Sequence, residues 1–246
     1  MHGYNKAKGQ GSNNDYSNKT PLDEFYFYKA VHSHNNQDKI YYYSKAIKIE
    51  PNYSIAYLGR AMVYADLERY NDAIADYTRL TKIDPDYGAV YDFRGRAYYQ
   101  LGKYNDAVDD FTKSIGIDPN YASQFHSRGR AYYDLGKYNE AVIDFTKSIS
   151  IGPNNPQTYF YRAFASIMIA RQYPNEKNIF ITRTIDACDD WKRLCDLGDE
   201  MSCEAYKNEC AGGNWGDMIE TCIAWKRGCD LGKKTSCREY DDYCTY

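Results

Sequence analysis

Cysteine is absent from most of this 246-residue chain, because the first of its eight cysteines is Cys188. No stretch approaches the roughly 18 consecutive apolar residues that a membrane-spanning helix needs. Phosphate-binding glycine loops, nucleophile elbows and C-x-x-C pairs are missing, and the four histidines, at positions 2, 32, 34 and 126, lie far from the cysteines. The sequence therefore predicts no enzyme activity, no bound metal, no cofactor and no membrane span.

Strong net charge is missing too. The formal net charge is only −3, which gives no reason to expect nucleic acid as a partner. Residues 1–20 are polar and rich in Gly, Asn and Ser, and they lack the apolar core of a secretory signal. We expect this segment to be disordered or to be a cloning remnant, with any original signal peptide removed.

What the chain does contain is a sequence that repeats three times with a period of 34 residues, over 53–86, 87–120 and 121–154. Within each copy, apolar and aromatic residues recur at helical spacing in two runs. Gly102 separates the two runs of the second copy, because glycine readily adopts the left-handed conformation that ends a helix. Pro119 ends the second run, since proline disfavours helix in the residue before it. A fixed period of this length predicts an all-α solenoid of antiparallel helix pairs, an architecture that presents an extended binding surface.

This pattern resembles the tetratricopeptide repeat family. The family's small and large packing positions are met in the second copy by Tyr91, Gly95, Tyr98, Ala107, Phe111 and Pro119. The resemblance implies a right-handed superhelix over residues 21–171, in which 21–52 is a degenerate capping repeat with Lys39 in place of a small alanine. A further first helix is expected at 156–171.

The partner of that last helix does not follow at the expected distance. Aligned with the family, residues 172–183 resemble an inserted loop. The partner helix is then expected at 184–197, with Ala187 at the small position and Trp191 at the large aromatic one. Residues 184–246 are expected to continue the solenoid as cysteine-rich helical repeats.

All eight cysteines fall in two blocks that begin at Ile185 and Ile219, 34 residues apart, and each block has the spacing C-x6-C-x7-C-x6-C. Cysteines seven residues apart share a helix face, so a hairpin that turns at Asp199 or Lys233 brings them together in nested pairs. The predicted disulfides are Cys188–Cys210, Cys195–Cys203, Cys222–Cys244 and Cys229–Cys237. The alternative is that the eight cysteines are reduced and pack as small core residues in a cytosolic protein.

The spacing of Cys195 and Cys203 around Asp-Leu-Gly resembles Sel1-like repeats, including the cysteine-rich bacterial secreted proteins of that class. In those repeats a disulfide joins the two helices. A weaker resemblance, to the twin-cysteine hairpins of the mitochondrial intermembrane space, is disfavoured because their usual spacing is C-x9-C. Since disulfides persist outside the cytosol, we expect a periplasmic or secreted protein, with a cytoplasmic one as the alternative.

Function is predicted from the tetratricopeptide resemblance, which implies that fixed positions of the first helices line a concave groove. Those positions are Leu58, Met62, Asp66, Asp92, Arg96, Tyr99, Gln100, His126, Arg130, Tyr133, Phe160 and Phe164. Arg96 and Arg130, one repeat apart and beside tyrosines, suit a protein or peptide ligand with an acidic centre and apolar flanks. The alternative is that these charges only solvate an exposed helix face.

The family members that bind chaperone tails need a lysine and an asparagine in the groove. Here Asp92 or His126 stands at the lysine position, and an arginine stands at the asparagine position, so chaperone tails are not expected to bind. Arg94 and Arg128 are expected to pack between helices instead. A second function class is a cell-envelope or secreted Sel1-like protein that recognises a cell-wall fragment or self-assembles through its solenoid ends. The sequence leaves the partner and the oligomeric state open.

Overall fold

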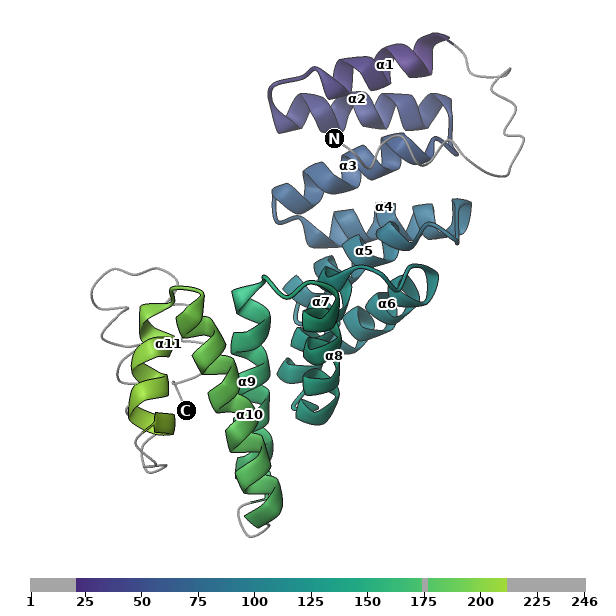
Figure 1. The fold of residues 1–246 in the computed structure, drawn as a ribbon. Helices are drawn as coiled ribbons and strands as arrows, with labels where there is room; N and C mark the ends of the chain where they lie inside the picture. The colour runs from purple at the N-terminus through teal and green to yellow at the C-terminus, as the bar shows by residue number, and fades with distance from the viewer. Residues whose placement is uncertain (1–20, 174–176, 212–246) are drawn as a thin grey trace. The chain divides into compact units, whose positions relative to one another are not determined.

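The structure is a computed structural model that describes residues 21–173 and 177–211. Every element within these ranges is a helix, and consecutive helices form antiparallel pairs, which confirms the expected all-α fold (Figure 1). The chain divides into two compact units between Val90 and Tyr91, and each unit is described by itself. The predictions for residues 1–20 lie outside the described residues.

The first unit, drawn in purple and blue in Figure 1, is built from two helix pairs. These pairs are α1 (Pro21–Val31) with α2 (Asn36–Ile49), and α3 (Ser54–Asp66) with α4 (Tyr70–Ile83). The pairs join because α2 also packs against α3. Alternating tyrosines and small aliphatic residues fill the core around this contact, which contains Ala30, Tyr43, Ala46, Tyr53, Ala56 and Val63.

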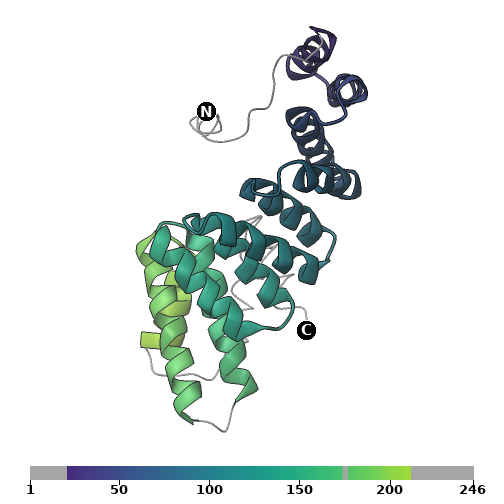
Figure 2. The same cartoon turned by 90° about the vertical axis from the view of Figure 1, so that its right-hand side faces the viewer.

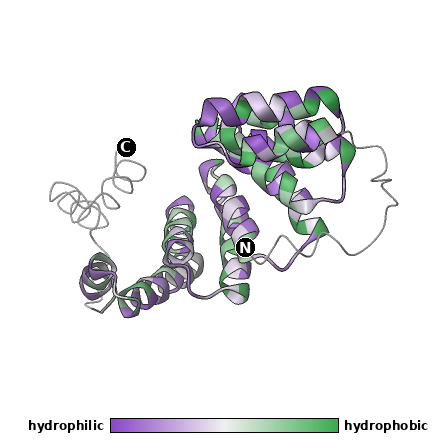
Figure 3. Ribbon diagram, turned by 90° about the horizontal axis from the view of Figure 1, so that it is seen from above, coloured by the Kyte–Doolittle hydropathy of each residue, from purple (hydrophilic) through white to green (hydrophobic). Residues whose placement is uncertain are grey.

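The second unit begins within α5 (Gly88–Gln100) and continues to the end of the described residues. Its further helices are α6 (Tyr104–Ile117), α7 (Ala122–Asp134), α8 (Tyr138–Ile151), α9 (Pro156–Gln172), α10 (Lys177–Asp196) and α11 (Glu200–Ala205), followed by the π-helical turn Tyr206–Ala211. Figure 2 shows α9 and α10 side by side. Every helix carries both polar and apolar residues (Figure 3), and the apolar ones of α8, α9 and α10 meet in one core around Phe145, Phe164 and Trp191.

In the turn between the two helices of a pair, one residue has a left-handed backbone conformation. Gly102 and Gly136 have φ angles of 70° and 71°, as expected for glycines that end a helix. The amide of Lys103 then donates back to the carbonyl oxygen of Tyr98 at 3.0 Å, which satisfies a terminal carbonyl of α5. In the first full repeat Glu68 takes the same conformation, with a φ of 58°, although a residue with a Cβ is strained there.

The small and large positions of the repeat meet as the family pattern requires. A Cβ on Gly95 would lie 2.9 Å from Cε1 of Phe111, and one on Gly129 would lie 2.8 Å from Cε1 of Phe145. Contacts this short are not tolerated in a packed core. Glycine at these two positions therefore lets the first helix approach the aromatic ring of the second.

The expected loop over 172–183 is wrong for most of its length, because α10 begins at Lys177. Helix α9 has 17 residues and α10 has 20, against 13 in α7 and 14 in α8. The inserted residues thus lengthen both helices, since an extended antiparallel pair keeps the backbone hydrogen bonds that a loop would leave unmade. Ala187 and Trp191, the expected small and large residues of α10, are both buried.

Candidate peptide-binding surface

Four arginines that stand one repeat apart hold the helix pairs together. Each makes two hydrogen bonds of 2.6–2.9 Å to one carboxylate on the second helix of its pair. The ion pairs are Arg60–Asp76, Arg94–Asp110, Arg128–Asp144 and Arg162–Asp190. The partners are 16 residues apart in the first three pairs and 28 apart in the fourth, and the difference of 12 is the length of the insertion at 172–183.

The same guanidinium groups reach the preceding repeat. Nη1 of Arg60 donates to Oγ of Ser44 at 2.8 Å, and Nη1 of Arg128 donates to Oγ1 of Thr112 at 3.1 Å. Burial raises the pKa of Asp144, and the hydrogen bonds from Arg128 oppose that shift. The packing role expected for Arg128 is confirmed. Its aspartate partner was not predicted from the sequence, although the aspartates also recur with the period of the repeat.

A second set of side chains lies on the first helices of the second unit, and we call it the arginine–tyrosine row. It consists of Arg96 and Tyr99 on α5, Arg130 and Tyr133 on α7, and Tyr161 on α9. The guanidinium carbon of Arg130 lies 5.0 Å from the ring centroid of Tyr99 and 4.8 Å from that of Tyr161. Arg130 is therefore held between tyrosines of the repeats on either side by cation–π contacts.

The two ends of this row differ in exposure, because Arg96 at one end is exposed and Tyr161 at the other end is buried. The side chain of Arg96 is 49% exposed, and its Nε donates to Oδ2 of Asp92 at 2.9 Å. Tyr99 donates its hydroxyl hydrogen to Oδ2 of Asp134 at 2.5 Å, which links α5 to α7. Burial raises the pKa of both Tyr99 and Tyr133, so both phenols are uncharged at neutral pH.

His126 lies beneath the row and is buried. Its Nδ1 is 2.9 Å from Oγ1 of Thr158, and its ring contacts the edge of Tyr161. Burial, helped by the positive charges of Arg130 and Arg96, lowers the pKa of His126 to about 4. The imidazole is therefore neutral at pH 7 and acts as a packing and hydrogen-bonding group.

The other residues predicted for the groove fall into different environments. Leu58, Met62 and Asp66 lie on α3 in the first unit, where Met62 and Asp66 are exposed and Leu58 is half-buried. Gln100 is exposed, while Asp92, like His126, is buried. Phe160 and Phe164 are also buried, with ring centroids 4.7 Å apart, and belong to the core.

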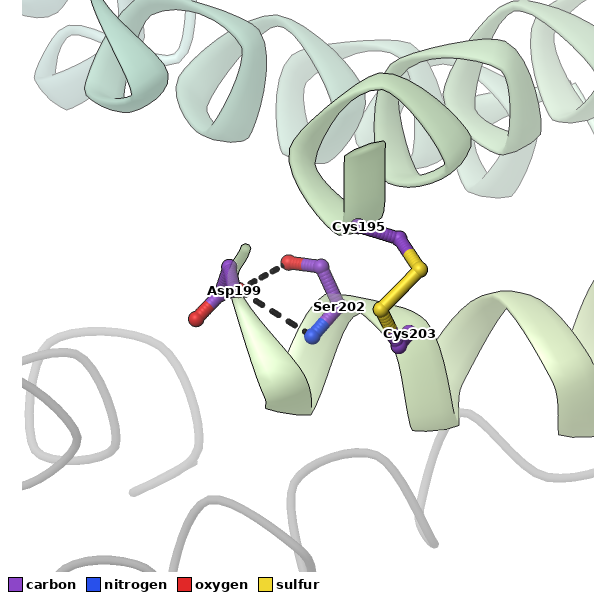
Figure 4. The surroundings of a disulfide bond; sticks show 4 residues. All are labelled: Cys195, Asp199, Ser202 and Cys203. Carbon is purple, nitrogen blue, oxygen red and sulfur yellow. Dashed lines mark hydrogen bonds between the residues drawn. A yellow bond between two sulfur atoms is a disulfide. The ribbon is translucent and has the colours of Figure 1, made fainter. Parts of the chain in front are cut away.

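The cysteine block on α10 and α11 is paired as predicted. The structure contains the disulfides Cys188–Cys210 and Cys195–Cys203. Figure 4 shows Cys195–Cys203 beside the turn, where Oδ2 of Asp199 accepts hydrogen bonds from both the amide and the hydroxyl of Ser202 and so caps α11. The remaining predictions, for Cys222, Cys229, Cys237 and Cys244, lie outside the described residues.

Two further predictions concern features expected to be missing. In the ranges that the structure describes, no group of three or more His, Cys, Asp or Glu side chains is placed to hold a metal ion. No helix in the same ranges is long and apolar enough to cross a bilayer.

Comparison with known proteins identifies the repeats. Residues 54–87 match the tetratricopeptide repeat family, and residues 95–133 and 129–166 match a TPR repeat model. The chain between residues 54 and 166 is therefore made of tetratricopeptide repeats. These matches end before Cys188, so the resemblance of the cysteine blocks to Sel1-like repeats stays a prediction. No curated protein sequence matches the chain.

Solved structures share this fold at low sequence identity. The crystal structure of MamA protein is 19% identical over 72% of this chain and 96% of its own, with a TM-score of 0.62. MamA from Desulfovibrio magneticus RS-1 is 13% identical over the same shares of the two chains, with a TM-score of 0.63. YrrB, described as a TPR protein with an unusual peptide-binding site, is 17% identical over 76% of this chain and 91% of its own, with a TM-score of 0.61. At these identities the likeness establishes the fold alone.

Proposed function

We propose that this chain is a protein-interaction scaffold and that the arginine–tyrosine row binds an acidic segment of a protein partner. The observation that carries the proposal is the stacking of Arg130 between Tyr99 and Tyr161, with the exposed Arg96 one repeat away. A guanidinium whose plane is fixed by two rings loses little conformational freedom when it meets a carboxylate. The description of YrrB as a protein with a peptide-binding site supports the same use of the fold.

The burial of Phe160 and Phe164 limits which parts of a ligand can contact this surface. Both rings were predicted to line the groove for a ligand with apolar flanks, but their burial leaves little surface for such a flank to contact. In this proposal the acidic centre of the ligand contributes most of the binding, and an apolar flank near α9 contributes little. Since α3 belongs to the other unit, Leu58, Met62 and Asp66 remain a separate prediction.

The test uses a fluorescent peptide with blocked ends and a Glu-Asp-Glu centre, and a matching peptide with Gln-Asn-Gln. Fluorescence anisotropy should show that the acidic peptide binds more tightly. In the double variant Arg96→Glu, Arg130→Glu, binding should weaken at least about 100-fold, since each charge-assisted hydrogen bond contributes about 1.5–3 kcal/mol.

The matched control is Lys113→Glu with Lys147→Glu. These exposed lysines are also one repeat apart, and they lie on the second helices of the same two repeats. This variant makes the same change in net charge away from the row, so it should bind the acidic peptide almost as well as wild type. Equal binding of the acidic and neutral peptides, or equal weakening in both double variants, would show that the row does not recognise acidic ligands.

We also propose that the chain works in an oxidising compartment, in the periplasm or outside the cell. Two disulfides within one short helical hairpin support this, because cytosolic thiols are kept reduced.

A further inference from the structure

One end of the arginine–tyrosine row carries a guanidinium group with unused donors. The side chain of Arg96 is 49% exposed, and its Nε is taken by Asp92. Within the residues that the structure describes, its two Nη groups donate no hydrogen bond. Two parallel Nη–H donors match the two oxygens of a carboxylate. The outer end of Arg96 is therefore built to receive a carboxylate from elsewhere.

The chain has a matching acidic segment of its own near its end. Residues 239–242 read Glu-Tyr-Asp-Asp, so three of four consecutive residues are acidic. Outside the described residues, Asp241 and Asp242 are the only acidic residues next to each other in the sequence. This segment is thus the strongest match in charge to the row among the parts of the chain that the structure does not describe.

The repeat does not require these acidic residues. The two cysteine blocks are 34 residues apart and have their cysteines at equivalent positions. The first block forms both of its disulfides with other residues at the positions of the three acids. Those residues are Ala205, Lys207 and Asn208. The acidic cluster is therefore particular to the second block, which indicates a role other than folding of the hairpin.

Helical spacing also suits this role. In the hairpin predicted for the second block, Cys237 and Cys244 share the face that meets the partner helix. At about 100° per residue, Asp242 and Glu239 lie about 140° and 200° around the helix from Cys237. Their carboxylates are thus predicted on the side opposite the disulfides, where they are available to another part of the molecule.

The row and the cysteine blocks are neighbours along the chain. Tyr161, at the α9 end of the row, lies on the helix that pairs with α10. Helix α10 is joined to the rest of the first block by both disulfides, and the second block follows directly in the sequence. Few residues therefore separate the acidic segment from the surface that it complements.

We propose that Glu239, Asp241 and Asp242 bind the arginine–tyrosine row of the same molecule, so that an external acidic ligand must displace them. This inference rests on the proposed function, because the row has to recognise carboxylates. A segment tethered in the same chain has an effective concentration in the millimolar range. Even a contact with a local dissociation constant of about 0.1 mM then keeps the row about nine-tenths occupied and weakens external binding about tenfold.

Labelling of arginine with phenylglyoxal tests the contact without any ligand. The full-length oxidised chain is compared with the variant Glu239→Gln, Asp241→Asn, Asp242→Asn, and the labelled sites are read by peptide mass spectrometry. The labelling rate of Arg96 should rise several-fold in this variant, up to about tenfold. Arg69, which is 46% exposed in the first unit, serves as the internal reference and should label at the same rate in both chains.

The matched control removes the same charges from the second helices of the repeats. Its substitutions are Asp106→Asn, Asp109→Asn and Glu140→Gln, at exposed positions of α6 and α8. It should label Arg96 at the wild-type rate. Equal labelling of Arg96 in the wild type and the first variant overturns the inference, and so does an equal rise in the control. Protection that grows with protein concentration from about 1 to 100 µM would mean that a second copy supplies the segment, which overturns binding within one molecule.

Fluorescence anisotropy with the Glu-Asp-Glu peptide separates this inference from the proposed function. The variant that lacks the three carboxylates should bind the peptide about tenfold more tightly than wild type, and the control should bind it as wild type does. A peptide that binds none of the three chains contradicts the proposed function, whereas the labelling of Arg96 still decides the contact. Binding of the peptide with equal affinity to all three chains leaves the proposed function standing and overturns the inference.

Discussion

At the scale of single residues, Glu68 stands out because its backbone is left-handed, whereas the equivalent residue in each of the next two repeats is glycine. Gly102 and Gly136 occupy the same turn one and two repeats later. The left-handed conformation brings a Cβ too close to the following carbonyl oxygen, at a cost of about 1–2 kcal/mol. Glycine avoids that cost but loses more chain entropy on folding, about 0.5–1 kcal/mol.

Glu68→Gly should therefore stabilise the chain by up to about 1.5 kcal/mol, the largest difference between the two effects. The midpoint of urea unfolding, followed by circular dichroism, should rise. The matched change in the opposite direction, Gly136→Glu, should lower the midpoint by a similar amount. A midpoint that falls in both variants would mean that Glu68 makes interactions that outweigh the strain.

At the scale of elements, the arginine–aspartate pairs are the repeating link between the two helices of each pair. In the third full repeat the Asp144 side chain is only 4% exposed and that of Arg128 is 16% exposed. Burying two charges is unfavourable unless each has its full set of hydrogen bonds, which the bidentate geometry supplies. The pair therefore fixes the register of α7 against α8 more than it adds net stability.

Asp144→Ala should destabilise the chain by about 3–5 kcal/mol, because it leaves the guanidinium of Arg128 half-buried without its counter-ion. Replacing both residues, Arg128→Met with Asp144→Leu, should recover most of that loss. Urea unfolding of the two variants measures the difference. If the double variant is as unstable as the single one, the ion pair itself stabilises the repeat and the role in register is wrong.

The period of the sequence predicted these helices and their pairing, because a 34-residue unit fixes which residues face the neighbouring helix. It also predicted Cys188–Cys210 and Cys195–Cys203, since mirrored spacings around Asp199 suit one nested pairing. The repeat period predicts which face of its helix a side chain lies on, but it does not predict how far neighbouring residues bury that side chain. For that reason the burial of Phe160, the buried state of His126 and the contact of Tyr161 with Arg130 were not foreseen.

At the scale of the whole molecule, the chemistry that holds the repeats together changes along the chain. Within the residues that the structure describes, the last arginine–aspartate pair is Arg162–Asp190, and two disulfides join α10 to the segment that follows it. The short α11 with its π-helical turn packs against α10, and both disulfides cross this contact. A helix this short is marginal without covalent links or extensive packing.

Non-reducing peptide mapping of protein from an oxidising compartment should therefore recover Cys188–Cys210 and Cys195–Cys203, and it will also test Cys222–Cys244 and Cys229–Cys237. Dithiothreitol should lower the thermal midpoint, because each nested bridge contributes on the order of 2–3 kcal/mol. A Cys195→Ser, Cys203→Ser variant should show part of this loss without reductant. Bridges that join the two cysteine blocks would contradict the hairpin arrangement, and free thiols would contradict the proposed compartment as well.

Because Arg128 bonds to both Asp144 and Thr112, it affects how the chain unfolds locally. Its side chain donates hydrogen bonds to Asp144 in its own repeat and one hydrogen bond to Thr112 in the repeat before it. When α8 detaches, the guanidinium loses its carboxylate and its position against α6 at the same moment. We therefore expect fluctuations to spread across neighbouring repeats instead of stopping at one, so that the amide protons of α6, α7 and α8 should exchange with solvent as a single cooperative group.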